Sequence, residues 1–367
     1  MKKVRHLLGI SGGKDSAALA IYMKDKYPQL DIEYYTCDTG KELAETYQLI
    51  KNLEIYLGKK IIQLQATDGK NEDPFDHFLK MYGGYLPSSN SRWCTKKLKL
   101  EPFEKFVGND PVISYVGIRG DEDREGYISR KSNIQSIFPF RQNIWSEDVI
   151  IKVLYNKNID QLLRLYKSLD FAATTNRFEQ ILAQPVSQSY TAIQKLQQFM
   201  ETDVKVFNSM VFSFLKTTDY PLAQEHGFGL IDNDEILIRD DIFNILEKSG
   251  VGIPQYYKKV DFVVNGKEGQ YARSRSGCYF CFFQQKIEWV WLYEQHPERF
   301  AKAMEYEKDG YTWCQDESLA ELVLPERMQR IKEDFIKKQE KAGITKKDWK
   351  DIVLEEAEGE GCAACFI

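Results

Sequence analysis

One short stretch of the sequence carries residue types that can bind a phosphate. In "SGGKDS", residues 11–16, the glycines let backbone N–H groups approach phosphate oxygens closely, and Ser11 and Ser16 can donate hydrogen bonds to them. Lys14 can neutralise the charge that develops as a phosphate–phosphate bond breaks, and Asp15 can help to hold Mg²⁺. The spacing fits neither GxxxxGK[ST] nor GxGxxG. We expect a phosphate-binding turn that leads from a strand into a helix.

The cysteines of the chain point to a second kind of chemistry, in which sulfur atoms bind a metal or take part in redox reactions. The chain has seven cysteines, which are Cys37, Cys94, Cys278, Cys281, Cys314, Cys362 and Cys365. This cysteine usage favours metal or redox chemistry over a disulfide framework. Thiolates at CxxC spacing can hold one metal, and soft sulfur ligands select iron–sulfur clusters or zinc. Arg92, Lys96 and Lys97 around Cys94 would lower the pKa of its thiol.

The elements that must position these residues follow from hydrophobic periodicity. The sequence predicts strands over 4–10, 31–38, 59–66 and 112–119, and helices over 14–27 and 41–58. Alternation at this spacing predicts an α/β fold with a doubly wound parallel sheet. Ligands of such sheets bind beyond the carboxyl ends of the strands. We therefore expect the site at 11–16, 37–40 and 119–124.

The chain divides into three predicted domains by composition. Residues 1–155 hold the nucleotide-binding sheet, residues 156–260 form a helical insertion rich in Gln and Leu, and residues 261–367 form a helical C-terminal region that contains the CxxC pair. A charged helix is predicted over 327–350. The role of residues 156–250 does not follow from the sequence.

Composition narrows the functional classes. The net charge of −5 argues against a general polyanion-binding protein, and the basic stretches 92–99 and 337–350 are typical of solvated helix faces. We find no run of 18 apolar residues, and the N-terminal apolar run is too short for a signal peptide, so we expect a cytoplasmic protein without a membrane span. The aromatic stretch 278–300 favours core packing and cluster shielding over base stacking.

The motif at residues 11–16 resembles the PP-loop of ATP pyrophosphatases. Members of that family cleave ATP between the α- and β-phosphates, release pyrophosphate and form an adenylated substrate. The resemblance implies that ATP and Mg²⁺ bind at this loop.

Three further motifs narrow the resemblance. "CDTGKELAET" (37–46), "VGIRGDEDR" (116–124) and "FPFRQNIWSEDVI" (138–150) are similar to segments of phosphoadenosine phosphosulfate (PAPS) reductases and their relatives. The resemblance covers residues 4 to about 155. It implies a nucleotide site made of Ser11, Gly12, Gly13, Lys14, Asp15, Ser16, Asp38, Thr39, Gly40 and Arg119. Within that set it implies catalytic roles for Lys14, Asp15, Asp38 and Arg119.

The cysteine region resembles only part of a known pattern. The ECGxH-like motif of assimilatory PAPS reductases is absent from the sequence. "RWCTKKLKLEPF" (92–103) resembles the 4Fe–4S type of adenylylsulfate reductase, with Trp93 in place of the first cysteine. The resemblance implies Cys94, Cys278 and Cys281 as cluster ligands, with a four-cysteine Zn²⁺ site as the alternative. The fourth ligand stays open between Cys314, Cys362, Cys365 and an open iron.

An ATP-cleaving loop combined with a thiolate-bound cluster is similar to the DndC and SspD group of DNA phosphorothioation proteins. That resemblance implies a sulfurtransferase of phage defence. Its expected partners are a cysteine desulfurase as sulfur donor, other subunits of the system, and DNA as substrate, reached directly or through a partner. Two alternatives stay open: a sulfonucleotide reductase of sulfate assimilation, and a non-catalytic, nucleotide-sensing subunit of a defence complex.

Overall fold

The computed structural model describes residues 3–67, 72–122, 129, 131–169, 176–308 and 310–342. It contains two compact units, each built from separate segments of the chain. Unit 1 consists of Met1–Gly9, Ala18–Tyr34 and Val107–Ile245, and unit 2 of Ile10–Ala17, Tyr35–Phe106 and Leu246–Ile367. The three sequence domains, whose boundaries follow the chain, stay a prediction.

A five-stranded parallel sheet confirms the predicted α/β fold. Its order is β3-β2-β1-β4-β5, and its strands are β1 (Arg5–Gly9), β2 (Ile32–Cys37), β3 (Ile61–Leu64), β4 (Val112–Tyr115) and β5 (Ile134–Ile137). β1 pairs in parallel with β4 and β4 with β5, with Arg5 opposite Val112 and Val112 opposite Ile134. Apolar side chains along β1 and β4 are fully buried, as is usual for parallel strands. The sequence analysis found four of these strands and missed β5.

Helices follow the strands and make up most of the remaining structure. Those of the first half are α1 (Lys14–Lys26), α2 (Ala44–Leu57), α3 (Pro74–Met81), α4 (Trp93–Thr95), α5 (Glu101–Val107) and α6 (Glu147–Val153). Those of the second half are α7 (Ile159–Ser168), α8 (Asn176–Ala183), α9 (Ala192–Thr202), α10 (Val204–Leu215), α11 (Arg239–Lys248), α12 (Lys286–Gln295), α13 (Pro297–Glu305), α14 (Leu319–Leu322) and α15 (Pro325–Ala342). In the described residues, no helix is both long and apolar enough to span a membrane.

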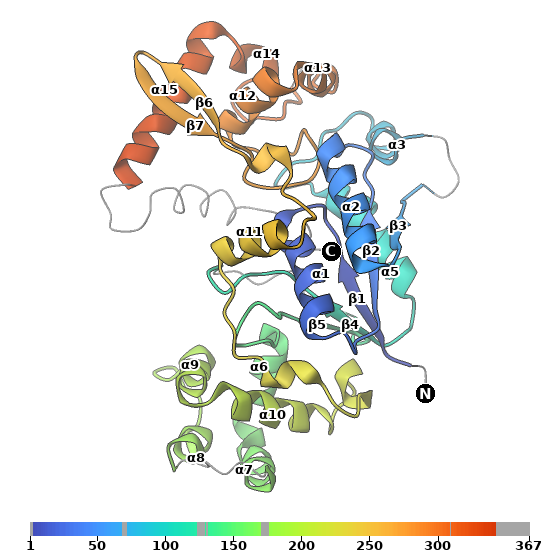
Figure 1. The fold of residues 1–367 in the computed structure, drawn as a ribbon, viewed down its shortest axis with the longest axis vertical. Helices are drawn as coiled ribbons and strands as arrows, with labels where there is room; N and C mark the ends of the chain where they lie inside the picture. Colours follow the sequence, from blue (N-terminus) through green and yellow to red (C-terminus); the bar gives the residue numbers. More distant parts are fainter. Residues whose placement is uncertain are drawn as a thin grey trace. The chain divides into compact units, whose positions relative to one another are not determined.

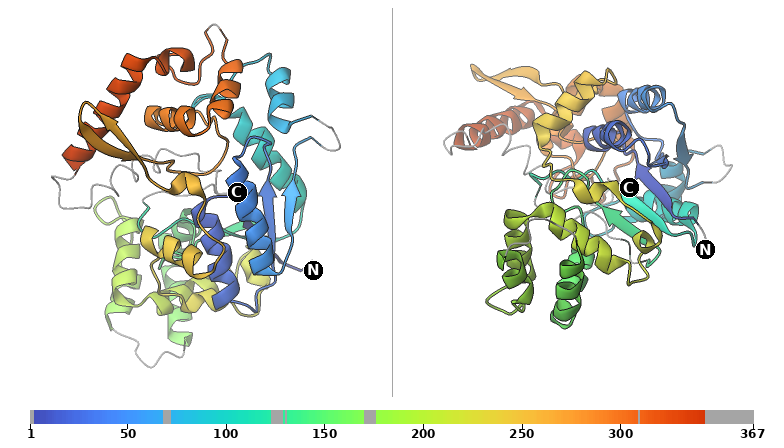
Figure 2. Two further views of the ribbon diagram at one scale, coloured as in Figure 1. Left: turned by 45° about the horizontal axis from the view of Figure 1, so that its top comes forward. Right: turned by 60° about the horizontal axis from the view of Figure 1, so that its bottom comes forward.

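Part of the predicted helical insertion, residues 159–215, forms a small helical bundle within unit 1. Helices α7 to α10 lie side by side (Figure 2), and rings from four of its positions form a continuous stack of contacts. These rings are Tyr166, Phe178, Phe199 and Phe207. A Thr191–Gln194 capping box starts α9. The bundle therefore has its own apolar core.

The C-terminal part of unit 2 combines helices with a hairpin that the sequence analysis did not predict. The hairpin pairs β6 (Val260–Val264) with β7 (Lys267–Tyr271) and lies beside α12 and α15 (Figure 1). Side chains of the hairpin belong to the same apolar cluster as many aromatic rings. Within that cluster, Phe280 contacts Phe75 and Trp313. The charged tail helix predicted over 327–350 is α15, which is described as far as Ala342.

Candidate functional site

The loop between β1 and α1 has the backbone geometry of a phosphate cradle. Gly12 has a φ of +74°, and a Cβ there would lie 2.2 Å from the Thr46 Cγ2 atom. A Cβ on Gly13 would lie 2.6 Å from the Ser276 hydroxyl oxygen. Any larger residue would therefore strain or block the loop. The 13-residue helix α1 begins at Lys14, so its unpaired N–H groups add a positive end to the loop.

The polar side chains of the loop hold one another. The Ser16 hydroxyl accepts from the Ser11 N–H at 3.1 Å, donates to the Gly13 carbonyl at 3.2 Å, and lies 3.1 Å from the Ser11 hydroxyl. The Lys14 ammonium donates to Asp15 at 3.1 Å, and both side chains are almost fully buried. The structure thus keeps a cation and two hydroxyls in one small loop.

Two tyrosines that the sequence analysis missed support this loop. Tyr256 is buried, and its hydroxyl donates to the Gly12 carbonyl at 3.0 Å. The Tyr257 hydroxyl accepts from the Lys14 N–H at 3.3 Å, and its ring centroid lies 5.4 Å from the Lys14 ammonium. Both residues follow α11 in sequence and sit some 240 positions from the loop, so only the fold reveals their role.

The predicted second motif lies directly after β2. Asp38 accepts from the Gly40 N–H and from the Tyr47 hydroxyl, each at 2.9 Å. Gly40 has a φ of +77°, and a Cβ there would lie 2.6 Å from an Asp73 carboxylate oxygen. The glycine is therefore required by the turn, and the turn holds the Asp38 carboxylate in place.

Thr39 connects this motif to the CxxC segment. Its side chain is 1% exposed, its hydroxyl donates to the Glu42 carboxylate at 2.6 Å, and the same oxygen lies 3.1 Å from the Cys278 sulfur. Burial raises the pKa of Glu42 to about 7, with the nearby Asp38 charge adding to the effect. Burial also raises the pKa of the Cys278 thiol, and the Glu42 charge adds to it. A thiol and a carboxyl group are thus joined through one hydroxyl.

The segment before the CxxC pair is fixed against both motifs. The Ser276 hydroxyl donates to the Ser11 carbonyl at 3.5 Å, and the Tyr279 N–H donates to the Lys41 carbonyl at 2.9 Å. Glu288, in the first turn of α12, is buried and accepts from both the N–H and the hydroxyl of Ser274, at 2.7 and 2.9 Å. The start of α12 therefore anchors residues 274–279 beside the loop.

Arg273 introduces a buried positive charge into the same segment. The residue is 2% exposed, and one of its guanidinium nitrogens donates to the Cys278 carbonyl at 3.0 Å. Its other two nitrogens have no hydrogen-bond partner within the described ranges. Because a buried cation without a counter-charge is unfavourable, this guanidinium fits a site that receives an anion.

A small cavity joins the loop, the β2 end and the CxxC segment. Its volume is about 200 Å³, and its wall includes Ser11, Cys37, Asp38, Glu42, Thr46, Tyr47, Lys99 and Gly277. Residues predicted from two separate motifs therefore meet at one place in unit 2. Burial raises the pKa of the Cys37 thiol in this wall to about 12.

The predicted metal ligands share one part of unit 2 without forming an assembled site. Cys94 on α4 and Cys278 pack against the same apolar cluster, and the Cys281 N–H donates to the Cys278 carbonyl at 3.3 Å. In the part of the chain that the structure describes, no three His, Cys, Asp or Glu side chains are arranged to hold a metal ion. Cys362 and Cys365 lie outside the described residues. The ligand assignment and the Asp15 role in holding Mg²⁺ stay predictions.

Arg119 belongs to unit 1, unlike the rest of the predicted nucleotide site. Its guanidinium is fully buried and pairs with Asp121 at 2.8 Å and with Glu122 at 2.7 Å. The Arg141 side chain donates to the Arg119 carbonyl at 3.2 Å. Arg124, at the end of the same motif, lies outside the described residues. The catalytic role of Arg119 stays a prediction.

The first half of the chain is similar to a known protein domain. Residues 5–168 match the phosphoadenosine phosphosulfate reductase domain. The match covers both motifs that surround the small cavity. The match ends with α7, so helices α8 to α10 of the bundle and the CxxC segment lie beyond the matched residues.

Two relatives from Methanocaldococcus jannaschii share a segment of similar length. The chain is 34% identical over 165 residues to Uncharacterized protein MJ0066, which is 41% of this chain and 32% of the relative. It is 28% identical over 168 residues to Uncharacterized protein MJ0973, which is 41% of this chain and 38% of the relative. The matched segment thus spans about a third of the first relative and somewhat more than a third of the second, and neither name states an activity.

Proposed function

We propose that this chain is an ATP-dependent, pyrophosphate-releasing sulfurtransferase of DNA phosphorothioate modification and phage defence. An oxygen of a DNA phosphate attacks the α-phosphorus of ATP, and the bond to pyrophosphate breaks. Two electrons from a thiol reductant release the donor's persulfide sulfur as sulfide, and this sulfide bonds to the activated DNA phosphorus as the bond to AMP breaks. ATP and Mg²⁺ are the cofactors of the first step.

The contact between Thr39 and Cys278 is the observation that carries this proposal. It puts a thiol 3.1 Å from a residue of the predicted nucleotide site, next to the small cavity that Ser11 and Asp38 also line. A plain nucleotide-binding module has no need for sulfur at that position. The contact therefore favours a reaction in which nucleotide and sulfur chemistry share one site.

The loop residues have separable tasks in the proposed first step. The N–H groups of Gly12, Gly13 and the α1 terminus bind phosphate oxygens, with the hydroxyls of Ser11 and Ser16 beside them. Lys14 stabilises the negative charge that develops on the leaving pyrophosphate, because a buried cation acts strongly in a water-poor site. Asp15 and Asp38 are the carboxylates nearest the loop that we assign to Mg²⁺ and to positioning the nucleotide.

We propose Cys94, Cys278 and Cys281 as ligands of a 4Fe–4S cluster, with Zn²⁺ as the alternative. The donor set suits either metal, since thiolates are soft ligands. The raised pKa of the Cys278 thiol means that metal binding must displace its proton. When bound, a cluster supplies a place for sulfide or electrons. A cysteine desulfurase is the proposed sulfur donor, and other subunits of the system are proposed partners.

The match of residues 5–168 favours a second candidate, a sulfonucleotide reductase. The two candidates differ in whether ATP is cleaved or a sulfonucleotide is reduced. Anaerobic protein is incubated with labelled ATP, Mg²⁺ and DNA, or with adenylylsulfate and a thiol reductant, and pyrophosphate and sulfite are measured. DNA-stimulated pyrophosphate release supports the sulfurtransferase, sulfite supports the reductase, and ATP binding without either product would identify a nucleotide-sensing subunit.

A further inference from the structure

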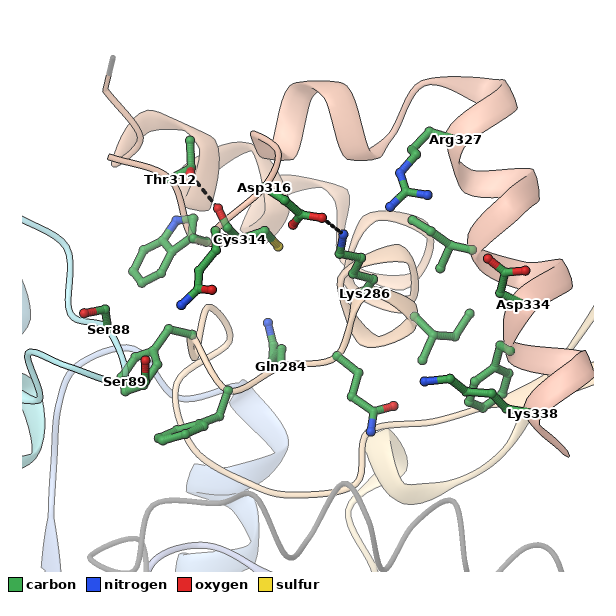
Figure 3. Close-up of a pocket in the computed structure, with 18 residues that line it drawn as sticks. Ser88, Ser89, Gln284, Lys286, Thr312, Cys314, Asp316, Arg327, Asp334 and Lys338 are labelled. Atoms are coloured by element: carbon green, nitrogen blue, oxygen red, sulfur yellow. Dashed lines mark hydrogen bonds and ion pairs between the residues drawn. The ribbon is translucent and has the colours of Figure 1, made fainter. Parts of the chain in front are cut away.

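A second and larger cavity lies in the C-terminal part of unit 2. Its volume is about 630 Å³, and it is lined by the start of α12, the segment 312–316, two serines of residues 88–89 and one face of α15 (Figure 3). It is about three times as large as the cavity beside the phosphate loop. This space is large enough for a nucleotide.

The wall of this cavity includes two adjacent aromatic rings that are only partly buried. Phe282 and Phe283 are half-buried, and their ring centroids lie 4.4 Å apart. Neighbouring aromatic residues of the same stretch, such as Phe280 and Trp289, are fully buried in the apolar cluster. The expectation of core packing over 278–300 thus holds for those residues and in part for Phe282, which packs against the same cluster, whereas Phe283 is not among the residues of that cluster. Adjacent rings whose faces are partly exposed form a surface on which a base can stack.

Gln284 adds a hydrogen-bonding group beside these rings. The residue is 7% exposed, yet neither its amide nitrogen nor its amide oxygen has a hydrogen-bond partner among the residues described. Figure 3 shows its amide end pointing into the space between Cys314 and Lys338. A primary amide presents a donor and an acceptor side by side, which matches the edge of a nucleobase. A ligand of that kind would satisfy a group that is otherwise costly to bury.

The unpaired charge around the cavity is positive. Lys286 pairs with Asp316 and Glu317, and Arg327 pairs with Glu317, so these side chains are neutralised. Lys338 points into the cavity and has no partner in the described ranges (Figure 3). The Arg92 guanidinium lies 5.1 Å from the Phe283 ring centroid and has no carboxylate partner in those ranges. Two cations beside a stacking surface suit a nucleotide phosphate.

We propose that this cavity binds one unpaired nucleotide of the DNA acceptor. The base stacks on Phe282 and Phe283, its edge pairs with the Gln284 amide, and Arg92 and Lys338 bind the adjacent phosphates. The choice of DNA rests on the proposed function, whereas the nucleotide chemistry rests on the cavity itself. Binding here would hold single-stranded or locally opened DNA on unit 2.

Fluorescence anisotropy with a labelled oligothymidylate tests this site in the full-length protein. We expect saturable binding that Phe283→Ala weakens about 10-fold, which is the loss of one base–aromatic stack. Gln284→Met, which keeps the side-chain volume, should weaken binding several-fold. Tyr293→Ala on the exposed side of α12 is the matched control and should bind like the wild type. Thermal melting of each variant separates lost binding from lost folding.

Several outcomes overturn the proposal. Unchanged affinity in folded Phe283→Ala and Gln284→Met would exclude the cavity as the binding site. Equal competition by free thymidine monophosphate would show a free-nucleotide site, and preference for RNA of the same sequence would assign another acceptor. Oligonucleotide binding without pyrophosphate release would refute the proposed function alone, whereas DNA-stimulated pyrophosphate release without cavity-dependent binding would refute this inference alone.

Discussion

The helical bundle of unit 1 and the site region of unit 2 treat buried polar side chains differently. In the bundle, the Lys195 ammonium is fully buried and donates to the carbonyls of Leu182 and Gln184 at 3.0 and 2.6 Å. Asn208, also fully buried, accepts from the Trp145 indole N–H at 2.8 Å and donates to two backbone carbonyls. These polar groups are satisfied by the fold itself.

In unit 2, several buried side chains lack such partners among the described residues. They include the indole N–H groups of Trp289 and Trp291 in the apolar cluster and, near the candidate sites, Arg273 and Gln284. Two guanidinium nitrogens of Arg273 and both amide atoms of Gln284 have none within the described residues. Each unsatisfied buried group costs on the order of 1–3 kcal/mol, which a fold retains more easily where a ligand compensates. The contrast suggests that the bundle's polar groups serve stability and that those of unit 2 serve binding. Substitutions should then separate the two effects.

Lys14→Ala should show the largest effect on chemistry with the fold intact. Removing the buried cation of the loop should lower pyrophosphate release at least about 100-fold, because the developing charge loses its main stabilisation. The measurement is pyrophosphate release with ATP and DNA, alongside thermal melting. Lys302→Ala, an exposed lysine of α13, is the control and should keep full activity. Undiminished release by a folded Lys14→Ala protein would remove the loop from the mechanism.

Cys278→Ser should remove bound metal while leaving the fold in place. We expect the loss of iron and of the broad absorbance near about 400 nm that an iron–sulfur cluster gives. Iron, zinc and sulfide are assayed in protein purified without oxygen. Cys37→Ser is a matched control, since the Cys37 thiol lies at the end of β2 and donates to the Lys99 carbonyl. Iron content equal to that of the wild type would show that the assigned ligand set is wrong, and zinc alone would make the cysteines structural.

Asn208→Ala should lower the stability of the fold and leave pyrophosphate release unchanged, which is the reverse of the result expected for Lys14→Ala. It leaves the Trp145 N–H and the facing carbonyls without partners, so unfolding should become easier by about 2–3 kcal/mol. Chemical denaturation measures this change, with the exposed Asn244→Ala as control. Pyrophosphate release per folded molecule should stay at the wild-type value. A large loss of pyrophosphate release at unchanged stability would contradict the assignment of the bundle's polar groups to stability and those of unit 2 to binding.

The sheet was predictable because its strands are apolar runs at regular spacing. β1, β2, β3 and β4 match the predicted strands within a few residues, since buried parallel strands have a strong sequence signal. β5, with its polar Gln135 and Ser136, carries less of that signal, although both residues are buried. The β6–β7 hairpin alternates exposed and buried residues over only five positions, which leaves little periodicity to detect.

The candidate site was predictable only where its residues form local motifs. The glycines and hydroxyls of 11–16 and the turn at Asp38–Gly40 are short-range features, and Ser11 from the first motif and Asp38 from the second line one cavity. Glu42 lies within the motif at residues 37–46, three positions after Thr39. That spacing could have identified it as a hydrogen-bond partner of Thr39. Tyr256 and Tyr257 have no local signature, because their contact with the loop depends on long-range packing. The same holds for Gln284, which stands out only once its missing partners are known.

The smallest expected effect is a pH dependence of stability that comes from Lys195. Burial lowers the pKa of its ammonium to about 8, below the ordinary value of 10.5. Above pH 8 the folded state releases this proton before the unfolded state does, so the unfolding free energy rises by about 1 kcal/mol between pH 8 and 9. The neutral amine can still donate to the Leu182 and Gln184 carbonyls, so raising the pH does not cost those bonds.

Denaturation curves for the wild type and Lys195→Met between pH 7 and 9.5 measure this contribution as a difference. Groups that titrate alike in both proteins cancel, and only the wild type should gain stability as pH rises. Parallel curves would mean that the buried amine keeps an ordinary pKa. If pyrophosphate release followed the same pH profile and Lys195→Met abolished that profile, the bundle would take part in the chemistry. Its polar groups would then not be purely structural.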